Sequence, residues 1–101
     1  MGKELYESFP ESKAVFDKAD KILGFSLSGL MFRGDPEMLK LTINSQPAIL
    51  TASIAAFEAF KARNDIKPEF MAGLSLGEYS ALVASGSLTF EAGIKLVRKR
   101  A

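Results

Sequence analysis

One serine of the sequence has the neighbours that a nucleophile needs. Gly73, Ser75 and Gly77 form a G-x-S-x-G pattern that follows the β-like residues 70–72 and precedes a helical stretch. In such a strand-to-helix turn the serine sits in a sharp, strained bend that pushes its Oγ outward, and the two glycines leave room for the backbone. The backbone N–H of Leu76 then points, at the helix N-terminus, to where an oxyanion would form. The pattern predicts a serine nucleophile, and the alternative is a glycine-rich turn whose serine caps the helix.

The sequence contains no histidine and no cysteine. An imidazole is the usual general base for a serine nucleophile because its pKa lies near neutrality. Ser75 would therefore need a lysine, a carboxylate or a base from outside the chain. The same two absences exclude disulfides, thiolate catalysis and zinc sites of the usual His/Cys type.

Length and composition indicate one domain with a packed core. The chain has 101 residues, of which 48% are hydrophobic,. Thirteen basic and twelve acidic side chains leave a net charge of +1, whereas a nucleic-acid binder normally has a large basic footprint. The charged N-terminus lacks the apolar run of a signal peptide, and the longest uncharged stretch, residues 41–57, is too short and too polar to span a bilayer. We therefore expect a soluble, cytoplasmic protein that binds neither nucleic acid nor membrane.

The first third of the chain predicts short helices. Ser8 and Glu11 have capping-box spacing around Pro10, and Gly24 is a natural stop for the helix that follows,. Further short helical pieces are expected at residues 27–32 and 37–41.

The strongest helix prediction covers residues 45–64. Asn44 or Ser45 can cap this helix, and Pro47 would then stand in its first turn,. Because the interior is apolar on nearly every side, we expect this helix to run through the middle of the structure.

The C-terminal third predicts a strand at residues 69–74, a helix of roughly nine residues and a last helix of roughly eleven that begins near Thr89. At about 1.5 Å per residue, an antiparallel hairpin of these lengths returns residues near 100 to the level of the serine. Arg98 and Arg100 flank the inward stripe of the last helix on opposite sides, so periodicity allows either arginine at the site. For Arg98 and Lys99 we expect solvated positions that complement the helix dipole.

Four segments resemble the malonyl-CoA:acyl-carrier-protein transacylases and related polyketide acyltransferase domains. Residues 73–83 are similar to the family's active-serine segment, and residues 45–50 to its Thr-Gln-Pro-Ala helix start. Residues 96–100 resemble the segment with the arginine that binds the substrate carboxylate, and residues 1–5 resemble the sequence just after the first catalytic loop. The resemblance covers essentially all 101 residues, in order and at family-like intervals.

This resemblance implies an α/β fold, the α/β-hydrolase-like large subdomain of an acyltransferase, here mostly helical with the short strand at 69–74 leading into the serine turn. It also implies a two-step transfer in fatty acid biosynthesis. Ser75 takes a malonyl group from malonyl-CoA as an ester and passes it to the phosphopantetheine thiol of acyl carrier protein. Leu76 matches the oxyanion-hole residue, and Arg100 matches the arginine that holds the malonyl carboxylate by two parallel hydrogen bonds. Coenzyme A is part of the substrate, so no cofactor or metal is expected.

Two departures from the family pattern matter. Leu74 stands where the family has a histidine, which can alter how the serine loop is held. The family's first loop would precede Met1, and its catalytic histidine and ferredoxin-like subdomain would follow Ala101. We therefore expect residues 1–101 to be a partial acyltransferase domain, inactive or nearly so alone because Ser75 has no imidazole. An uncovered core would favour self-association.

Three other functions fit parts of the sequence. An acyltransferase domain of a polyketide synthase would use the same residues. A serine esterase would use the serine turn but has no use for a carboxylate-binding Arg100. A non-catalytic remnant would bind acyl carrier protein whatever the state of Ser75. Gln46, although part of a family-like motif, is expected mainly to satisfy backbone groups in the first turn of its helix.

Overall fold

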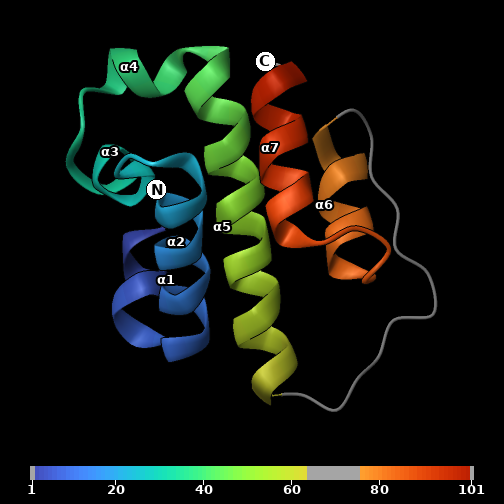
Figure 1. Cartoon of the computed structure of the whole chain (residues 1–101). Coiled ribbons are helices and arrows are strands. Elements are labelled where there is room, and N and C mark those ends of the chain that lie inside the picture. The colour runs from blue at the N-terminus through green and yellow to red at the C-terminus, as the bar shows by residue number, and fades with distance from the viewer. Residues whose placement is uncertain (1, 64–75, 101) are drawn as a thin grey trace.

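The computed structural model describes residues 2–63 and 76–100, and within them the regular elements are seven α-helices. In chain order they are α1 (Lys3–Ser8), α2 (Pro10–Leu23), α3 (Leu27–Arg33), α4 (Pro36–Lys40), α5 (Thr42–Arg63), α6 (Leu76–Ala84) and α7 (Phe90–Arg100). The long helix α5 runs through the middle, with α1 to α4 on one side and α6 and α7 on the other (Figure 1). The strand predicted at residues 69–74 lies outside the described residues. None of the described helices is long and apolar enough to span a membrane.

The helix that was predicted to end at Gly24 is confirmed as α2. Pro10 occupies the first position, where its missing N–H costs little, and Gly24 ends the helix at φ 78°,. The capping role predicted for Ser8 is wrong. Ser8 is the last residue of α1, because the N–H of Phe9 still bonds to the carbonyl of Leu5. Phe9 then stands at the N-cap of α2 without a side-chain hydrogen bond.

The two short helices predicted next are also confirmed, each with a side-chain cap. At α3 the Oγ of Ser26 accepts a hydrogen bond from the N–H of Gly29 at 3.1 Å. At α4 a carboxylate oxygen of Asp35 accepts one from the N–H of Glu37 at 2.9 Å. These caps satisfy N–H groups that the first turn of a helix leaves unpaired.

The helix α5 begins at Thr42, earlier than predicted, so neither Asn44 nor Ser45 caps it. The Nδ2 of Asn44 instead donates to the carbonyl of Met38 at 2.8 Å, which ties α5 to α4. Pro47 therefore stands inside the helix and removes one backbone hydrogen bond,. The turn before it is held by the N–H of Ser45, which bonds to the carbonyl of Leu41 at 2.8 Å, and this explains the early start.

The core has two parts, one on each side of α5. Towards α2 and α3, the α5 residues Ala48 and Ala55 pack with Phe16 and its neighbours. Towards α6 and α7, Leu50 and Ile54 pack with the buried residues of α7. The central position predicted for this helix is confirmed, because both faces are buried against other helices.

The helices α6 and α7 form the antiparallel hairpin that their lengths predict, nine residues out and eleven back. Gly86 at φ 84° lies in the turn between them, and the Oγ1 of Thr89 accepts from the N–H of Ala92 at 3.1 Å as the cap of α7. A Cβ placed on Gly93 would lie 2.7 Å from a methyl carbon of Val83, so α6 and α7 approach closely because residue 93 has no side chain. In consequence α7 ends beside the start of α6 (Figure 1).

One mostly apolar stripe of α5 stays uncovered. It consists of Ile49, Ser53, Ala56 and Phe60, which recur at helical spacing and are all exposed,. Ile49 is 44% exposed and Phe60 is 49% exposed. We call these four residues the outer stripe. It runs along α5 from Ile49 to Phe60.

Candidate active site

The predicted nucleophile lies at the edge of the described residues. Ser75 is outside them, and the helix α6 begins at the next residue, Leu76. The backbone N–H of Leu76 therefore belongs to the first turn of a helix, where N–H groups have no partner within the helix and the helix dipole favours negative charge. This is the position that an oxyanion donor following Ser75 requires.

The side chain of Arg100 lies beside the same helix, α6. It is the last residue of α7, and its guanidinium carbon lies 5.4 Å from the centre of the Tyr79 ring. Tyr79 stands early in α6, four residues after Ser75 in the sequence. The distance is within the range in which an aromatic face attracts a cation. The return predicted from the helix lengths is therefore confirmed for Arg100 relative to α6.

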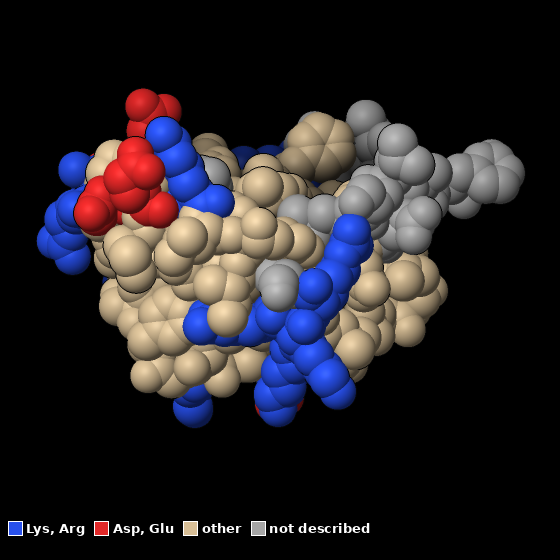
Figure 2. Space-filling view, turned by 90° about the horizontal axis from the view of Figure 1, so that it is seen from above, with Lys and Arg blue, Asp and Glu red and all other residues tan. Residues whose placement is uncertain are grey.

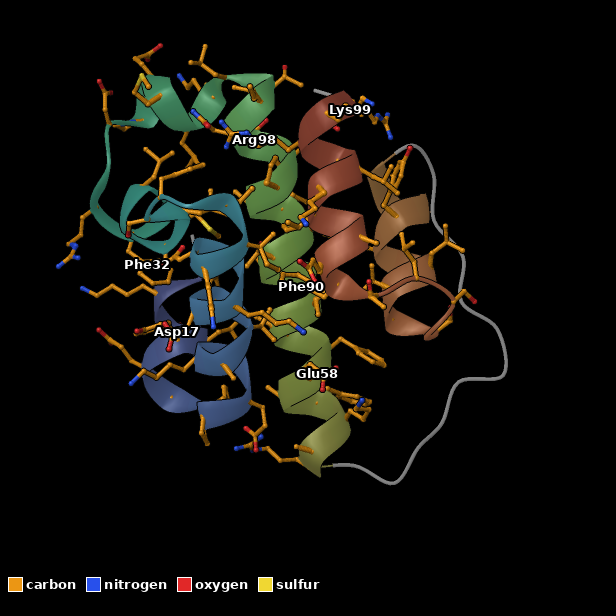
Figure 3. The ribbon with its side chains drawn as sticks, in the orientation of Figure 1. Asp17, Phe32, Glu58, Phe90, Arg98 and Lys99 are labelled. Carbon is orange, nitrogen blue, oxygen red and sulfur yellow. The ribbon has the colours of Figure 1, made fainter. Side chains whose placement is uncertain are left out.

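Arg98 does not share this position. Its guanidinium carbon lies 4.6 Å from the centre of the Phe25 ring, on the α2–α3 side of the molecule. Figure 3 shows Arg98 and Lys99 on different sides of the last turn of α7. The solvated position predicted for Arg98 is wrong, because its Nη1 atom is buried, while Lys99 is exposed as predicted. Arg98 departs from the prediction because Phe25, which follows Gly24, offers its guanidinium an aromatic face.

The end of the molecule at which α7 finishes is basic. The last turn of α7 carries Arg98, Lys99 and Arg100. Seen from this end, Lys and Arg side chains gather over the protein surface near the middle, while the acidic side chains lie to one side (Figure 2). A positive potential beside the start of α6 favours anionic groups there, and a carboxylate or a phosphate has the matching charge.

Gln46 has a different environment from the one predicted. Its Oε1 atom is buried and has no hydrogen-bond partner in the part of the chain that the structure describes. Gln46 precedes Leu50 by one turn of α5, so it continues the α5 face that meets α6 and α7 towards the end where Arg100 lies,. The Oε1 atom therefore does not take part in the hydrogen bonding to backbone groups that was predicted for the Gln46 side chain.

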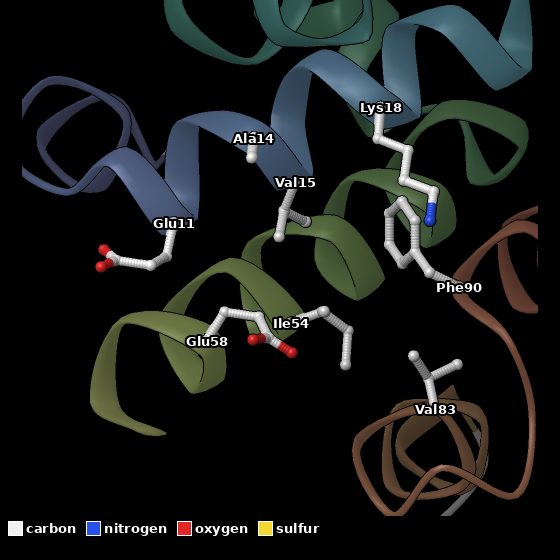
Figure 4. A pocket seen from close by; sticks show the side chains of 8 residues that line it. All are labelled: Glu11, Ala14, Val15, Lys18, Ile54, Glu58, Val83 and Phe90. Carbon is white, nitrogen blue, oxygen red and sulfur yellow. The ribbon is translucent and has the colours of Figure 1, made fainter. Parts of the chain in front are cut away.

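One described groove is lined by none of these residues. It measures about 400 Å³ and lies between α2, α5 and the turn of the α6–α7 hairpin, since Phe90 begins α7 and Val83 is near the end of α6 (Figure 4). Its floor is apolar and three charged side chains stand around it. Both carboxylates are already paired, Glu11 with Arg63 at 3.1 Å and Glu58 with Lys61 at 3.4 Å.

The pairing of Glu11 also changes its acidity. A hydrogen bond from its own backbone N–H, and then the bond from Arg63, hold the pKa of the Glu11 carboxyl below its ordinary value. A carboxylate held ionised in this way is a poor general base at neutral pH. No serine is among the described residues that line this groove, and the sequence has no Cys or His. Among the described residues, the groove therefore offers no unpaired carboxylate as a general base.

The contact between Tyr79 and Arg100 was not predicted from the sequence. A signal was available, because an aromatic side chain four residues after a nucleophile stands one helical turn along the same helix. The motif at residues 73–83 concerns the nucleophile, whereas the contact of Tyr79 depends on how α7 packs against α6.

The comparison with protein families decides the classification. Residues 1–101 match the family described as the acyl transferase domain. The chain belongs to this family. The malonyl CoA-acyl carrier protein transacylase of Bacillus subtilis (strain 168) is 58% identical over 100 residues, which are 99% of this chain and 31% of that relative.

Solved structures of the acyl transferase family agree with the helical arrangement. A malonyl CoA-acyl carrier protein transacylase from Coxiella burnetii superimposes with a TM-score of 0.94 at 44% identity and covers 99% of this chain and 32% of its own. A malonyl-transacylase solved in complex with a type II polyketide acyl-carrier protein superimposes with a TM-score of 0.90 at 41% identity, over 95% of this chain and 31% of its own. The chain thus has an acyltransferase fold, mostly helical in the described residues, and spans about a third of the length of the relatives it matches.

Proposed function

We propose that this chain forms the nucleophile-bearing part of a malonyl-CoA:acyl-carrier-protein transacylase of fatty acid biosynthesis. The observation that carries the proposal is the meeting of two helix ends. α6 starts directly after Ser75, and α7 ends with Arg100 against Tyr79 of α6. The 58% identical Bacillus subtilis relative bears the name of this activity, which supports the assignment.

In the proposed reaction the Oγ of Ser75 attacks the thioester carbonyl of malonyl-CoA and loses its proton to a base that this chain does not contain. The backbone N–H of Leu76 stabilises the oxyanion of the tetrahedral intermediate. The carbon–sulfur bond then breaks, coenzyme A leaves as the thiol, and a seryl ester remains. The phosphopantetheine thiol of acyl carrier protein attacks this ester and releases Ser75. Coenzyme A enters as part of the substrate, and the proposal requires no cofactor.

Arg100 is proposed to hold the free carboxylate of the malonyl group. A guanidinium presents paired N–H groups that match a carboxylate, and such charge-assisted bonds are stronger than neutral ones. This role distinguishes the proposal from a serine esterase, which does not require a free carboxylate on the acyl group.

The fold proposed for the whole site extends beyond the described helices. We propose that residues 69–74 form the strand of an α/β-hydrolase-like large subdomain, and that residues 1–101 make up part of that subdomain. The general base and a ferredoxin-like subdomain would be supplied by other parts of a complete transacylase. The length of the relatives supports this, because the chain matches 31% of the Bacillus subtilis protein.

The proposal is tested in a chimeric enzyme in which residues 1–101 replace the matching third of the Bacillus subtilis transacylase. We expect the chimera to transfer malonyl groups to acyl carrier protein and Ser75→Ala to abolish the transfer. Arg100→Ala should lower kcat/KM for malonyl-CoA roughly a hundredfold, since it removes two hydrogen bonds to a charged group. Its kcat/KM for acetyl-CoA should change far less.

Lys99→Ala is the matched control, because Lys99 is adjacent, exposed and equally charged. Its malonyl transfer should stay within about twofold of the parent chimera, as single exposed charges contribute little. A chimera without transferase activity, or equal losses of malonyl and acetyl transfer in Arg100→Ala, would contradict the proposal. The chain alone should transfer malonyl several orders of magnitude more slowly, because it has no histidine,.

A further inference from the structure

We propose that Tyr79 is a positioning residue whose ring holds the guanidinium of Arg100 in the orientation that selects acyl groups with a free carboxylate. The inference rests on the proposed function of Arg100 as the carboxylate-binding residue. It starts from the contact between the two helix ends, in which the guanidinium carbon lies 5.4 Å from the centre of the Tyr79 ring.

The position of Arg100 explains what a ring contact can contribute. It is the last residue of α7 and is exposed. A long arginine side chain at a helix end samples many rotamers, and fixing it for a ligand costs conformational entropy. An aromatic face that attracts the guanidinium reduces the number of these rotamers before a ligand binds, which is preorganisation.

A contact with an aromatic face does not use the N–H groups of a guanidinium. A guanidinium is planar, and an aromatic ring can cover its face while its N–H groups point outward in the plane. Those in-plane N–H groups are the ones that bind a carboxylate by two parallel hydrogen bonds. The Tyr79 ring can therefore hold Arg100 without competing with an acyl carboxylate.

Tyr79 is itself held firmly and aimed at the right end of α6. Its side chain packs against the core cluster of Leu50, Ile54, Ile94 and Val97, so the ring rests on a buried surface. Side chains on a helix lean towards its N-terminus. The ring of Tyr79 thus covers the turn between its own Cα and Leu76, and Arg100 is placed over the beginning of the helix that follows Ser75.

The contact predicts selectivity more than overall activity. If the ring orients Arg100, its loss should weaken reactions of substrates that use the guanidinium and spare those that do not. If the ring only packs α6 against α7, its loss should harm every substrate alike through the position of the helix. The ratio of malonyl to acetyl transfer separates the two roles.

The experiment compares Tyr79→Leu and Tyr79→Phe in the chimeric enzyme. Tyr79→Leu should lower kcat/KM for malonyl-CoA by about two- to fivefold, mainly through KM, which is the size expected for an exposed cation–aromatic contact. It should leave kcat/KM for acetyl-CoA unchanged. Tyr79→Phe keeps the aromatic face and should behave as the parent for both substrates. An unchanged malonyl-to-acetyl ratio in Tyr79→Leu, or a loss in Tyr79→Phe as large as in Tyr79→Leu, would overturn the inference.

Failure of the proposed function gives a separate result. If Arg100→Ala leaves the malonyl-to-acetyl ratio unchanged, Arg100 is not the carboxylate-binding residue, whatever Tyr79 does. The contact itself is read in the isolated chain by NMR, because an aromatic face shifts the resonances of side-chain protons above it. The Arg100 side-chain protons should be shifted in the parent and in Tyr79→Phe and unshifted in Tyr79→Leu. Equal shifts in the parent and in Tyr79→Leu would show that the ring does not hold the arginine.

Discussion

At the scale of single residues, a few polar atoms decide how the helices are placed. Ser12 is fully buried, and its Oγ donates to the carbonyl of Ala55 at 2.7 Å, across the interface between α2 and α5. Arg98 and Arg100 show the limit of sequence reasoning at this scale. Periodicity placed them on opposite sides of α7 but could not say which side faced α6. The difference is set by Phe25 and Tyr79, which belong to other elements and enter only through packing.

The buried hydrogen bond of Ser12 contributes measurably to the free energy of unfolding. Ser12→Ala should lower the free energy of unfolding by about 1 kcal/mol, because it removes a buried hydrogen bond between two helices. Urea denaturation of the chain measures the change. Ser53→Ala is the matched control, since Ser53 lies in a helix and is exposed, and it should be neutral or slightly stabilising,. Equal effects of the two substitutions would mean that the bond to Ala55 contributes nothing.

At the scale of elements, the sequence predicted most helices but not all of their ends. Gly24, Gly86 and Thr89 are local signals, and each acts where its chemistry indicates. The start of α5 was missed because the Nδ2 of Asn44 donates to the carbonyl of Met38 and Asn44 does not cap the helix, and the N–H of Ser45 closes an earlier turn on the carbonyl of Leu41. The boundary between α1 and α2 was also missed. Only one residue separates the two helices, and the capping pattern at Ser8 did not show that Ser8 still belongs to α1.

The cap of α7 can be removed without touching the core. Thr89→Ala should destabilise the chain by about 1 kcal/mol, because the N–H of Ala92 loses its acceptor. Thr89→Ser keeps a side-chain oxygen at the N-cap and should restore most of the stability. Thermal unfolding followed by circular dichroism compares the two variants. A Ser variant as unstable as the Ala variant would indicate that the threonine methyl, and not the cap, stabilises the helix.

At the scale of the whole molecule, the apolar surface is unevenly covered. The sequence indicated that α5 should be central because it is apolar on nearly every side, and the structure buries two of its faces. The outer stripe remains exposed, with Ile49 at 44% and Phe60 at 49%. The sequence could not predict which stripe would be left, because that depends on how α2, α6 and α7 divide the circumference of α5.

The outer stripe should cause the isolated chain to self-associate. Replacing both Ile49 and Phe60 by Gln should weaken this association by about tenfold, because it removes apolar surface that another copy can bury. Sedimentation velocity over a range of concentrations measures the effect. Ile43→Gln is the matched control, since Ile43 is also exposed at 42% but lies about a third of a turn away around α5,. Association that persists in the double variant, or that is lost equally in the control, would exclude the outer stripe as the contact surface.

The close approach of α6 and α7 at Gly93 affects the position of the C-terminal end of α7. Gly93 lies against Val83 of α6, and Arg100 lies seven residues further along α7, about 10 Å away,. A methyl group added at residue 93 would push against Val83. A small tilt of α7 at this residue would displace the guanidinium of Arg100 by a larger distance than it displaces residue 93. The position of the Arg100 guanidinium relative to α6 therefore depends on a buried helix contact that involves neither Arg100 nor Tyr79.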